Sequence, residues 1–329
     1  MLHQYGVQSK NYDRTASDLY VDKPLTNVSI AYKNEDYLAD KILPTVKVNE
    51  ETGLIWSYGK ENFALKDLQR GDYSKSKQSS YSVASSKTYQ IVNYALHDFV
   101  TEKMRKQAAS PMQPDIDTTN NLSEILMLNK EYLAATALFN TGATGFSGYT
   151  ETLNNATARY QWDDYTNSNP IGDSSYARLS KIRASSGKVN DIHMIVGIDV
   201  WQQLENHPDF LENIKYTGSM GSPAQVDTST AAKLMKVSSI QVGSASYNSA
   251  NEGQTASLSN VWGKYALFYH KGQPAIKTAA TAVILDGGNW VRRWTEPAFR
   301  NASLIEVENA LQVNLTSAES GYLFSTAVA

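Results

Sequence analysis

The segment from Ile192 to Tyr216 constrains the fold more than any other part of the chain. Residues 192–198 form an apolar, β-branched run with the length of a buried strand. Asp199 follows directly and can cap a helix, and Gln202 stands three residues further on, where a capping box requires a Glu or Gln. The first half of the segment therefore predicts a buried strand that leads straight into a short helix.

The second half of the segment contains a proline break. Pro208 should end the first helix, because proline lacks an N–H and clashes with the preceding turn. Asp209 can cap a second helix from Phe210 to Tyr216. His207 precedes the break, where a backbone hydrogen bond is a better interpretation than catalysis. The whole segment predicts a strand, a helix, a break and a second helix.

The composition excludes several classes of protein. The chain has 329 residues, of which 41% are hydrophobic and 19% charged, and this is typical of a folded protein with a sizeable core. There is no cysteine, so disulfides, thiolate metal sites and cysteine nucleophiles are excluded. The formal net charge of -3 provides no global basic field for nucleic acid. The N-terminus lacks a signal-peptide core and no apolar run has the length of a membrane span. These features predict a soluble protein made in the cytosol.

Outside this segment the chain predicts a mixture of helices and strands. Residues 59–87 are polar and lack periodicity, which is unusual inside a compact domain and often functional. Residues 114–140 predict a long helix of about 25 residues. Asp286–Asn289 predicts a turn, and 142–173 a loop region. Further strands are expected at 46–48, 54–58, 88–96, 239–247, 264–270, 282–285 and 311–315, and helices at 174–186 and 231–236.

A search for catalytic motifs finds none of the familiar nucleophile, phosphate-binding or zinc patterns. His193 lies inside the apolar strand and is interpreted as a satisfied core group. Asp163 and Asp164 could hold a cation, although a solvated pair in a loop is the better interpretation. Trp162 and Tyr165, if exposed, could stack on sugars, or they could anchor a protein interface. No cofactor, metal ion or catalytic residue is predicted, and the chain is not expected to be an enzyme.

The distribution of charge suggests self-association. Residues 60–87 carry six basic and three acidic residues, whereas residues 107–175 carry eight acidic and two basic residues. Opposite charges on two parts of one chain suit head-to-tail contact between copies. The alternative is that these are two unrelated solvated faces. The candidate interface residues are Lys60, Lys66, Arg70, Lys75, Lys77, Asp115, Asp117 and Glu124, with Lys75 and Lys77 as the best candidates to face the acids.

Three stretches of the chain resemble one known family. Residues 25–32 read Leu-Thr-Asn-Val-Ser-Ile-Ala-Tyr, residues 39–44 read Ala-Asp-Lys-Ile-Leu-Pro, and residues 207–210 read His-Pro-Asp-Phe after a buried strand and a Val-Trp helix. Their content and order resemble the major capsid proteins of tailed bacteriophages of the Hong Kong 97 type.

The resemblance implies an α+β fold of the Hong Kong 97 type. It places an N-terminal arm at residues 1–45, and an extended β-hairpin loop at 46–100 that reaches over an adjacent subunit. A peripheral domain with a long spine helix would follow at 101–172, then an axial α/β domain at 173–285. Residues 286–329 would supply C-terminal strands that complete the peripheral domain. His207, Pro208, Asp209 and Phe210 are the structural motif within the axial domain.

The resemblance also implies a function. Such proteins form hexamers and pentamers of an icosahedral head that encloses double-stranded DNA without sequence-specific binding. The chain would be part of the virion and would assemble in the host cytoplasm, without a membrane. The short arm leaves no room for an internal scaffolding segment, so a separate scaffolding protein and a portal are the expected partners. Two alternatives stay open, an encapsulin-like nanocompartment shell and a carbohydrate-binding or carbohydrate-active protein.

Overall fold

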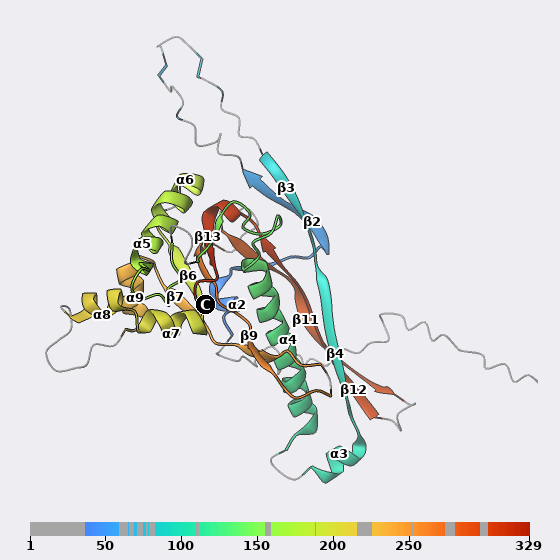
Figure 1. The fold of residues 1–329 in the computed structure, drawn as a ribbon. Helices are drawn as coiled ribbons and strands as arrows, with labels where there is room; N and C mark the ends of the chain where they lie inside the picture. Colours follow the sequence, from blue (N-terminus) through green and yellow to red (C-terminus); the bar gives the residue numbers. More distant parts are fainter. Residues whose placement is uncertain are drawn as a thin grey trace, which may run out of the picture. The chain divides into compact units, whose positions relative to one another are not determined.

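The computed structural model mixes helices and strands (Figure 1). It describes residues 37–58, 65, 69–70, 75–76, 78, 83–108, 112–154, 159–187, 189–215, 226–251, 253–273, 280–296 and 302–329. Most of the predicted arm, with the stretch at 25–32, lies outside the described residues, as do Lys60, Lys66 and Lys77. No helix among the described residues is long and apolar enough to cross a membrane.

The described residues belong to two compact units. The smaller unit contains residues 94–126 and 289–309, and the larger unit contains 37–93, 127–288 and 310–329. Helix α4 (Pro114–Leu138) and strands β4 (Val92–Val100), β11 (Ala282–Glu296) and β12 (Ala302–Leu315) each run from one unit into the other. The five segments implied by the resemblance have other boundaries than these two units, and they stay a prediction.

A five-stranded sheet forms the centre of the larger unit. Its order is β5 (Thr150–Thr152), β13 (Gly321–Ser325), β10 (Ala266–His270), β6 (Ile192–Gly197) and β7 (Ile240–Gly243). Strand β10 is antiparallel to both of its neighbours, whereas β5 and β7 run parallel to the strands that they pair with. The strands predicted around residues 192–198 and 264–270 are therefore confirmed, and they lie side by side.

Both faces of this sheet are buried, because successive side chains point to opposite faces and nearly all of them are apolar. The two faces contribute to separate hydrophobic clusters. Met194, Val196, Ala266, Phe268, Tyr322 and Phe324 belong to one cluster, and Ile195, Leu267, Tyr269 and Leu323 belong to the other. This accounts for the continuous apolar runs in the sequence.

The helix predicted at 174–186 begins earlier, at Pro170. It consists of α5 (Pro170–Ser175), a π-helical segment η3 (Tyr176–Ile182) and α6 (Arg183–Ser186) without interruption. Asn169 caps the first turn by accepting a hydrogen bond from Gly172 N at 2.7 Å. Gly187 ends the run with a φ of 71°, the left-handed conformation that glycine adopts without strain.

The helices around the His-Pro-Asp motif begin at other residues than predicted. Helix α7 (Ile198–Glu205) has Gly197 at its N-cap, so the prediction that Asp199 caps it is wrong. Asp199 instead accepts hydrogen bonds from the Asn260 side chain at 3.1 and 3.2 Å. Helix α8 (Pro208–Lys215) starts at the proline itself, because the missing N–H and fixed φ suit the first helical position. The remaining helix of this region is α9 (Thr228–Met235).

The smaller unit combines strands with one half of the long helix. Strands β11 and β12 are neighbours in a sheet of order β1 (Thr45–Lys47), β11, β12 and β4. The core of the unit contains Val100, Leu122, Leu126, Val291, Ile305 and Val307. The long helix predicted at 114–140 is confirmed as α4, with 25 residues, and a short helix α3 (Glu102–Gln107) precedes it.

The turn predicted at Asp286–Asn289 is wrong, because β11 continues through all four residues. Gly288 accommodates the irregularity with a φ of 118°. A Cβ at Gly287 would lie 3.2 Å from both Ala310 and Ile91, so this glycine permits close approach of neighbouring chain segments. Gly287 therefore marks close packing within the strand and not a change of chain direction.

Candidate subunit interface

The predicted extended loop begins as an antiparallel hairpin. Strand β2 (Thr52–Tyr58) pairs with β3 (Val83–Gln90), from Thr52 opposite Gln90 to Tyr58 opposite Val83. Of the candidate interface residues between the strands, the structure describes Arg70 and Lys75, and both are exposed. Arg70 and Lys75 thus lie in solvent between the two strands, and their role at an interface stays a prediction.

The root of the hairpin is held in the larger unit by apolar contacts. Ile55 and Tyr89 are 2% and 6% exposed, and they pack in a cluster with Ala280, Val283 and Leu285. A Cβ added at Gly53 would lie 2.6 Å from the ring of Tyr89. Glycine at position 53 therefore lets the ring cross strand β2 and close the cluster.

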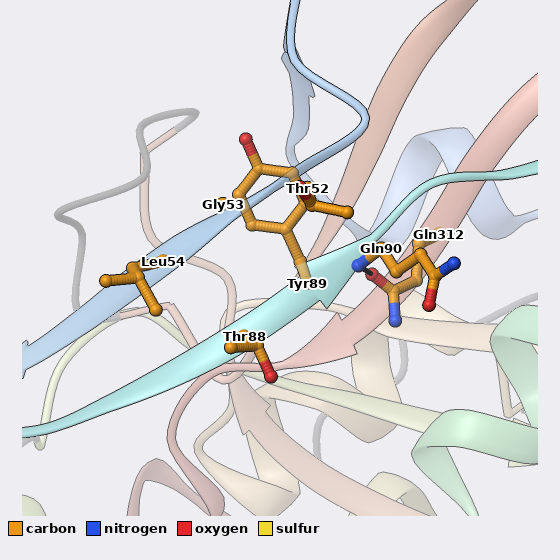
Figure 2. Close-up of a pocket in the computed structure, with 7 residues that line it drawn as sticks. All are labelled: Thr52, Gly53, Leu54, Thr88, Tyr89, Gln90 and Gln312. Carbon is orange, nitrogen blue, oxygen red and sulfur yellow. Dashed lines mark hydrogen bonds between the residues drawn. The ribbon is translucent and has the colours of Figure 1, made fainter.

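Hydrogen bonds to β12 fix the same root. Lys87 Nζ donates to Leu315 O at 3.0 Å, and Gln90 N donates to Gln312 Oε1 at 2.9 Å. Figure 2 shows Gln312 facing Gln90. The two residues lie at the edge of a groove with a volume of about 550 Å³. The groove is lined by Thr52, Gly53, Leu54, Thr88, Tyr89, Gln90 and Gln312. The base of the hairpin is thus anchored on the body of the subunit.

The candidate acids on α4 already have partners in the smaller unit. Asp115 accepts hydrogen bonds from Arg105 at 2.8 to 3.2 Å and lies 3.4 Å from Arg293. Asp117 accepts a hydrogen bond from Gln113 N at 3.1 Å, near the start of the helix. Two arginines of the same unit therefore compensate the charge of Asp115, and its assignment to an interface stays a prediction. Glu124 is half-buried on the same helix, and its assignment to an interface stays a prediction.

A buried carboxylate that sequence reasoning missed holds the start of the larger unit. Glu131 on α4 is fully buried, and its side chain accepts hydrogen bonds from Leu38 N at 2.9 Å, Ala39 N at 2.7 Å and Trp262 Nε1 at 2.7 Å. Burial raises the pKa of Glu131, and the three donors oppose that rise. The carboxylate caps helix α2 (Ala39–Ile42), within the second stretch on which the resemblance rests.

The His-Pro-Asp motif forms a polar network around the buried His207. Ser168, His207 and Asp209 stand in the order of a Ser–His–Asp triad, with 2.9 Å between Ser168 Oγ and His207 Nε2 and 3.8 Å between His207 Nδ1 and Asp209 Oδ2. His207 is fully buried, and burial lowers the pKa of its imidazole more than the Asp209 carboxylate raises it. The ring is therefore neutral at pH 7.

The hydrogen-bond directions in this network do not allow His207 to act as a general base toward Ser168. Asp209 N donates to His207 Nδ1 at 3.2 Å, so Nδ1 is the acceptor and the single ring proton lies on Nε2. The Ser168 hydroxyl donates to Asp164 O at 2.7 Å and accepts from His207 Nε2. Nε2 cannot take a proton from Ser168 in this arrangement. The network instead caps α8 and joins it to the loop at Ser168, which supports the structural interpretation of His207.

The other candidate binding residues also make hydrogen bonds within the subunit. Trp162, expected to be exposed, is fully buried and donates from Nε1 to Asp173 Oδ2 at 3.0 Å. Tyr165 is 40% exposed and donates to Gln203 Oε1 at 2.7 Å. His193 contacts Ser239 Oγ at 2.8 Å and Asp191 Oδ1 at 2.9 Å, which confirms it as a satisfied group. No cluster of three or more metal-ligating side chains occurs within the described ranges.

The sequence has curated relatives that span most of its length. No protein-family model matches the chain. The major capsid protein of Pseudomonas phage JBD67 is 26% identical over 317 residues, which cover 94% of this chain and 97% of that protein. The major capsid protein of Burkholderia phage BcepMu is 26% identical over 243 residues, which cover 74% of each.

Solved structures share the fold. A phage-related protein from Bordetella bronchiseptica RB50 has a TM-score of 0.71 at 21% identity, covering 94% of this chain and 98% of that chain. The mature capsid of bacteriophage PhiM1 has a TM-score of 0.53 at 8% identity, covering 90% and 88%. A virus-like particle from Pyrococcus furiosus also has a TM-score of 0.53, at 9% identity, covering 92% and 96%. These comparisons confirm the resemblance to phage major capsid proteins.

Proposed function

We propose that this chain is a major capsid protein that assembles into an icosahedral phage head of the Hong Kong 97 type. The observation that carries the proposal is the 26% identity to a phage major capsid protein over 94% of the chain. In this role the protein forms hexamers and pentamers around double-stranded DNA, within a virion assembled in the host cytoplasm. A separate scaffolding protein and a portal are the proposed partners.

Features of the subunit support this role. The root of the β2–β3 hairpin is packed and hydrogen-bonded, whereas the described residues between the strands are exposed, as suits a segment that reaches another copy. The Ser168–His207 network has the wrong proton placement for a nucleophile. The proposed role is therefore structural and not enzymatic.

Electron microscopy and light scattering of the purified full-length protein test the proposal. We expect rings or closed shells of megadalton mass, formed by the protein alone or together with the scaffolding protein from the same genome. A protein that stays monomeric under both conditions would contradict the capsid role.

The alternative of an encapsulin-like compartment draws support from the fold likeness to a virus-like particle. Isolation of particles from the native source separates the two roles, because a phage head contains double-stranded DNA and a compartment contains a cargo protein. We favour the phage head, since both curated relatives are phage capsid proteins. The carbohydrate alternative is weakened, because Trp162 is buried and its ring is not accessible for stacking on a sugar.

A further inference from the structure

The helical run α5–η3–α6 carries three cations in its second half. Arg178 and Lys181 lie in η3 and Arg183 lies in α6, and the next acidic residue along the chain is Asp191. Arg183 is exposed, and Lys181 Nζ lies 5.6 Å from the ring centroid of Tyr322. We call Lys181 and Arg183 the basic surface, and Arg178 is the buried cation that precedes them in the same run.

Arg178 is a buried cation without a complete set of acceptors. Arg178 is only 7% exposed. No atom of the described residues accepts a hydrogen bond from its Nε. A buried donor without an acceptor is costly, and a charged donor more so. It also lies in a π-helical segment, a distortion that is frequent at functional sites. Because its Nε is shielded from solvent, Arg178 adds positive charge to this part of the run and does not itself offer a contact to another molecule.

Helices α7 and α8 carry the opposite charge. They contain four acidic residues, of which Asp199 is bonded to Asn260, and one basic residue, Lys215. Glu205 and Glu212 are exposed and make no ion pair with any residue that the structure describes. Asp209 lies beside the neutral ring of His207. We call Glu205, Asp209 and Glu212 the acidic surface.

The helices that carry the two surfaces cover the same face of the five-stranded sheet, but they lie toward different edges of it. The helical run contacts β13 through Tyr176 and Tyr322, whose ring centroids are 6.0 Å apart, and Ser185 Oγ donates to Glu319 O just before β13. Helix α7 instead contacts β6 and β7. Because β13 and the β6–β7 pair are separated by β10 in the strand order, the surfaces are well separated on one copy, as Figure 1 also shows for α6 and α8.

We infer that copies of this chain associate head to tail, with the basic surface of one copy facing the acidic surface of the next. This arrangement repeats the same contact around a ring, and closure of the ring leaves neither surface unmatched. It also brings carboxylates toward Arg183, the exposed cation of the basic surface. The inference rests on the proposed function, and it names the charged residues that guide its subunit contacts.

Charge reversal on the full-length protein tests the inference. Arg183→Glu changes the basic surface, and Glu205→Lys and Glu212→Lys each change the acidic surface. We expect each single variant to assemble about tenfold more slowly than wild type at low salt, with a smaller deficit at high salt. Combining Arg183→Glu with one of the two lysine substitutions should restore the rate. Lys233→Glu, an exposed change of equal charge on α9, should assemble like wild type.

Light scattering gives the assembly rates, and thermal melting of the free subunits checks that every variant folds. The inference is overturned when Arg183→Glu assembles at the wild-type rate, although the proposed function then stands. It is equally overturned when the single variants are slow and neither combined variant recovers. Wild-type protein that never assembles contradicts the proposed function, and the inference with it.

Discussion

Replacement of Glu131 by glutamine should destabilise the larger unit, because three buried donors converge on its carboxylate. In Glu131→Gln the amide NH₂ takes the place of one oxygen, so at least one of the N–H groups of Leu38, Ala39 and Trp262 loses its acceptor. An unsatisfied buried donor costs about 1–3 kcal/mol, and the remaining bonds weaken when the charge is removed.

The net effect is smaller than the sum of these costs. Burial disfavours the ionised carboxylate, as the raised pKa of Glu131 shows, so the neutral amide recovers part of the loss. We expect a loss of about 2–3 kcal/mol in the free energy of unfolding. For a unit of this size that corresponds to a fall of about 4–12 °C in melting temperature.

Differential scanning calorimetry of the free subunit measures the effect. Asp40→Asn is the matched control, because Asp40 makes a nearby ion pair with Lys130 at 2.5 Å but its side chain is 67% exposed. An exposed ion pair contributes only about 0–1 kcal/mol. Equal melting temperatures for the two variants would refute the argument that Glu131 holds α2 in place.

Three further predictions concern the His-Pro-Asp motif and the hairpin. His207→Ala should lower the melting temperature more than Pro208→Ala in thermal melts, because His207 is buried with two side-chain hydrogen bonds while Pro208 only begins α8. Burial lowers the pKa of His207, so the imidazole takes up a proton more readily in the unfolded chain than in the folded one, and the free energy of unfolding should fall as the pH drops below about 6.5. Denaturant titrations at pH 7.5 and 5.5 measure this loss, which should be smaller in His207→Gln than in wild type. Gly53→Ala should loosen the hairpin root, because its Cβ would overlap Tyr89, and proteolysis within residues 59–82 should become faster in the free subunit; unchanged cleavage would contradict this packing.

Elements with strong local signals were predictable from the sequence. The long helix α4 and strand β6 were found because apolar periodicity and continuous apolar runs follow directly from burial on one side or on both. The predicted starts of α7 and α8 are wrong, because Asp199 and Asp209 are stronger capping residues in sequence than the positions used. In the structure Gly197 is the N-cap of α7, and α8 begins at Pro208. The turn predicted at Asp286–Asn289 is wrong for a tertiary reason, since Gly287 admits neighbouring chain segments at Ala310 and Ile91.

The polar network and the Glu131 site were not predictable in the same way. Glu131 accepts a hydrogen bond from the N–H of Ala39, which lies 92 residues away, and no sequence pattern links the two residues. The orientation of His207 depends on Ser168, which lies 39 residues upstream. Trp162 was interpreted as exposed because it stands in a polar loop, whereas its indole N–H reaches the buried Asp173.

Charge along the sequence gives no information on which charges are compensated within a subunit, and this distinction decides the choice of interface residues. Asp115 stood out among the acids of residues 107–175, yet Arg105 and Arg293 surround it in the fold. Glu205 and Glu212 were not among the candidate interface residues predicted from the sequence. Both are exposed, and they make no ion pair within the described residues. A compensated acid gains little from a second cation, whereas an exposed, uncompensated acid can still guide the approach of another copy. For this reason we place the charge contact between copies at α7–α8 and η3–α6, and we expect reversal of Glu212 to slow assembly more than reversal of Asp115.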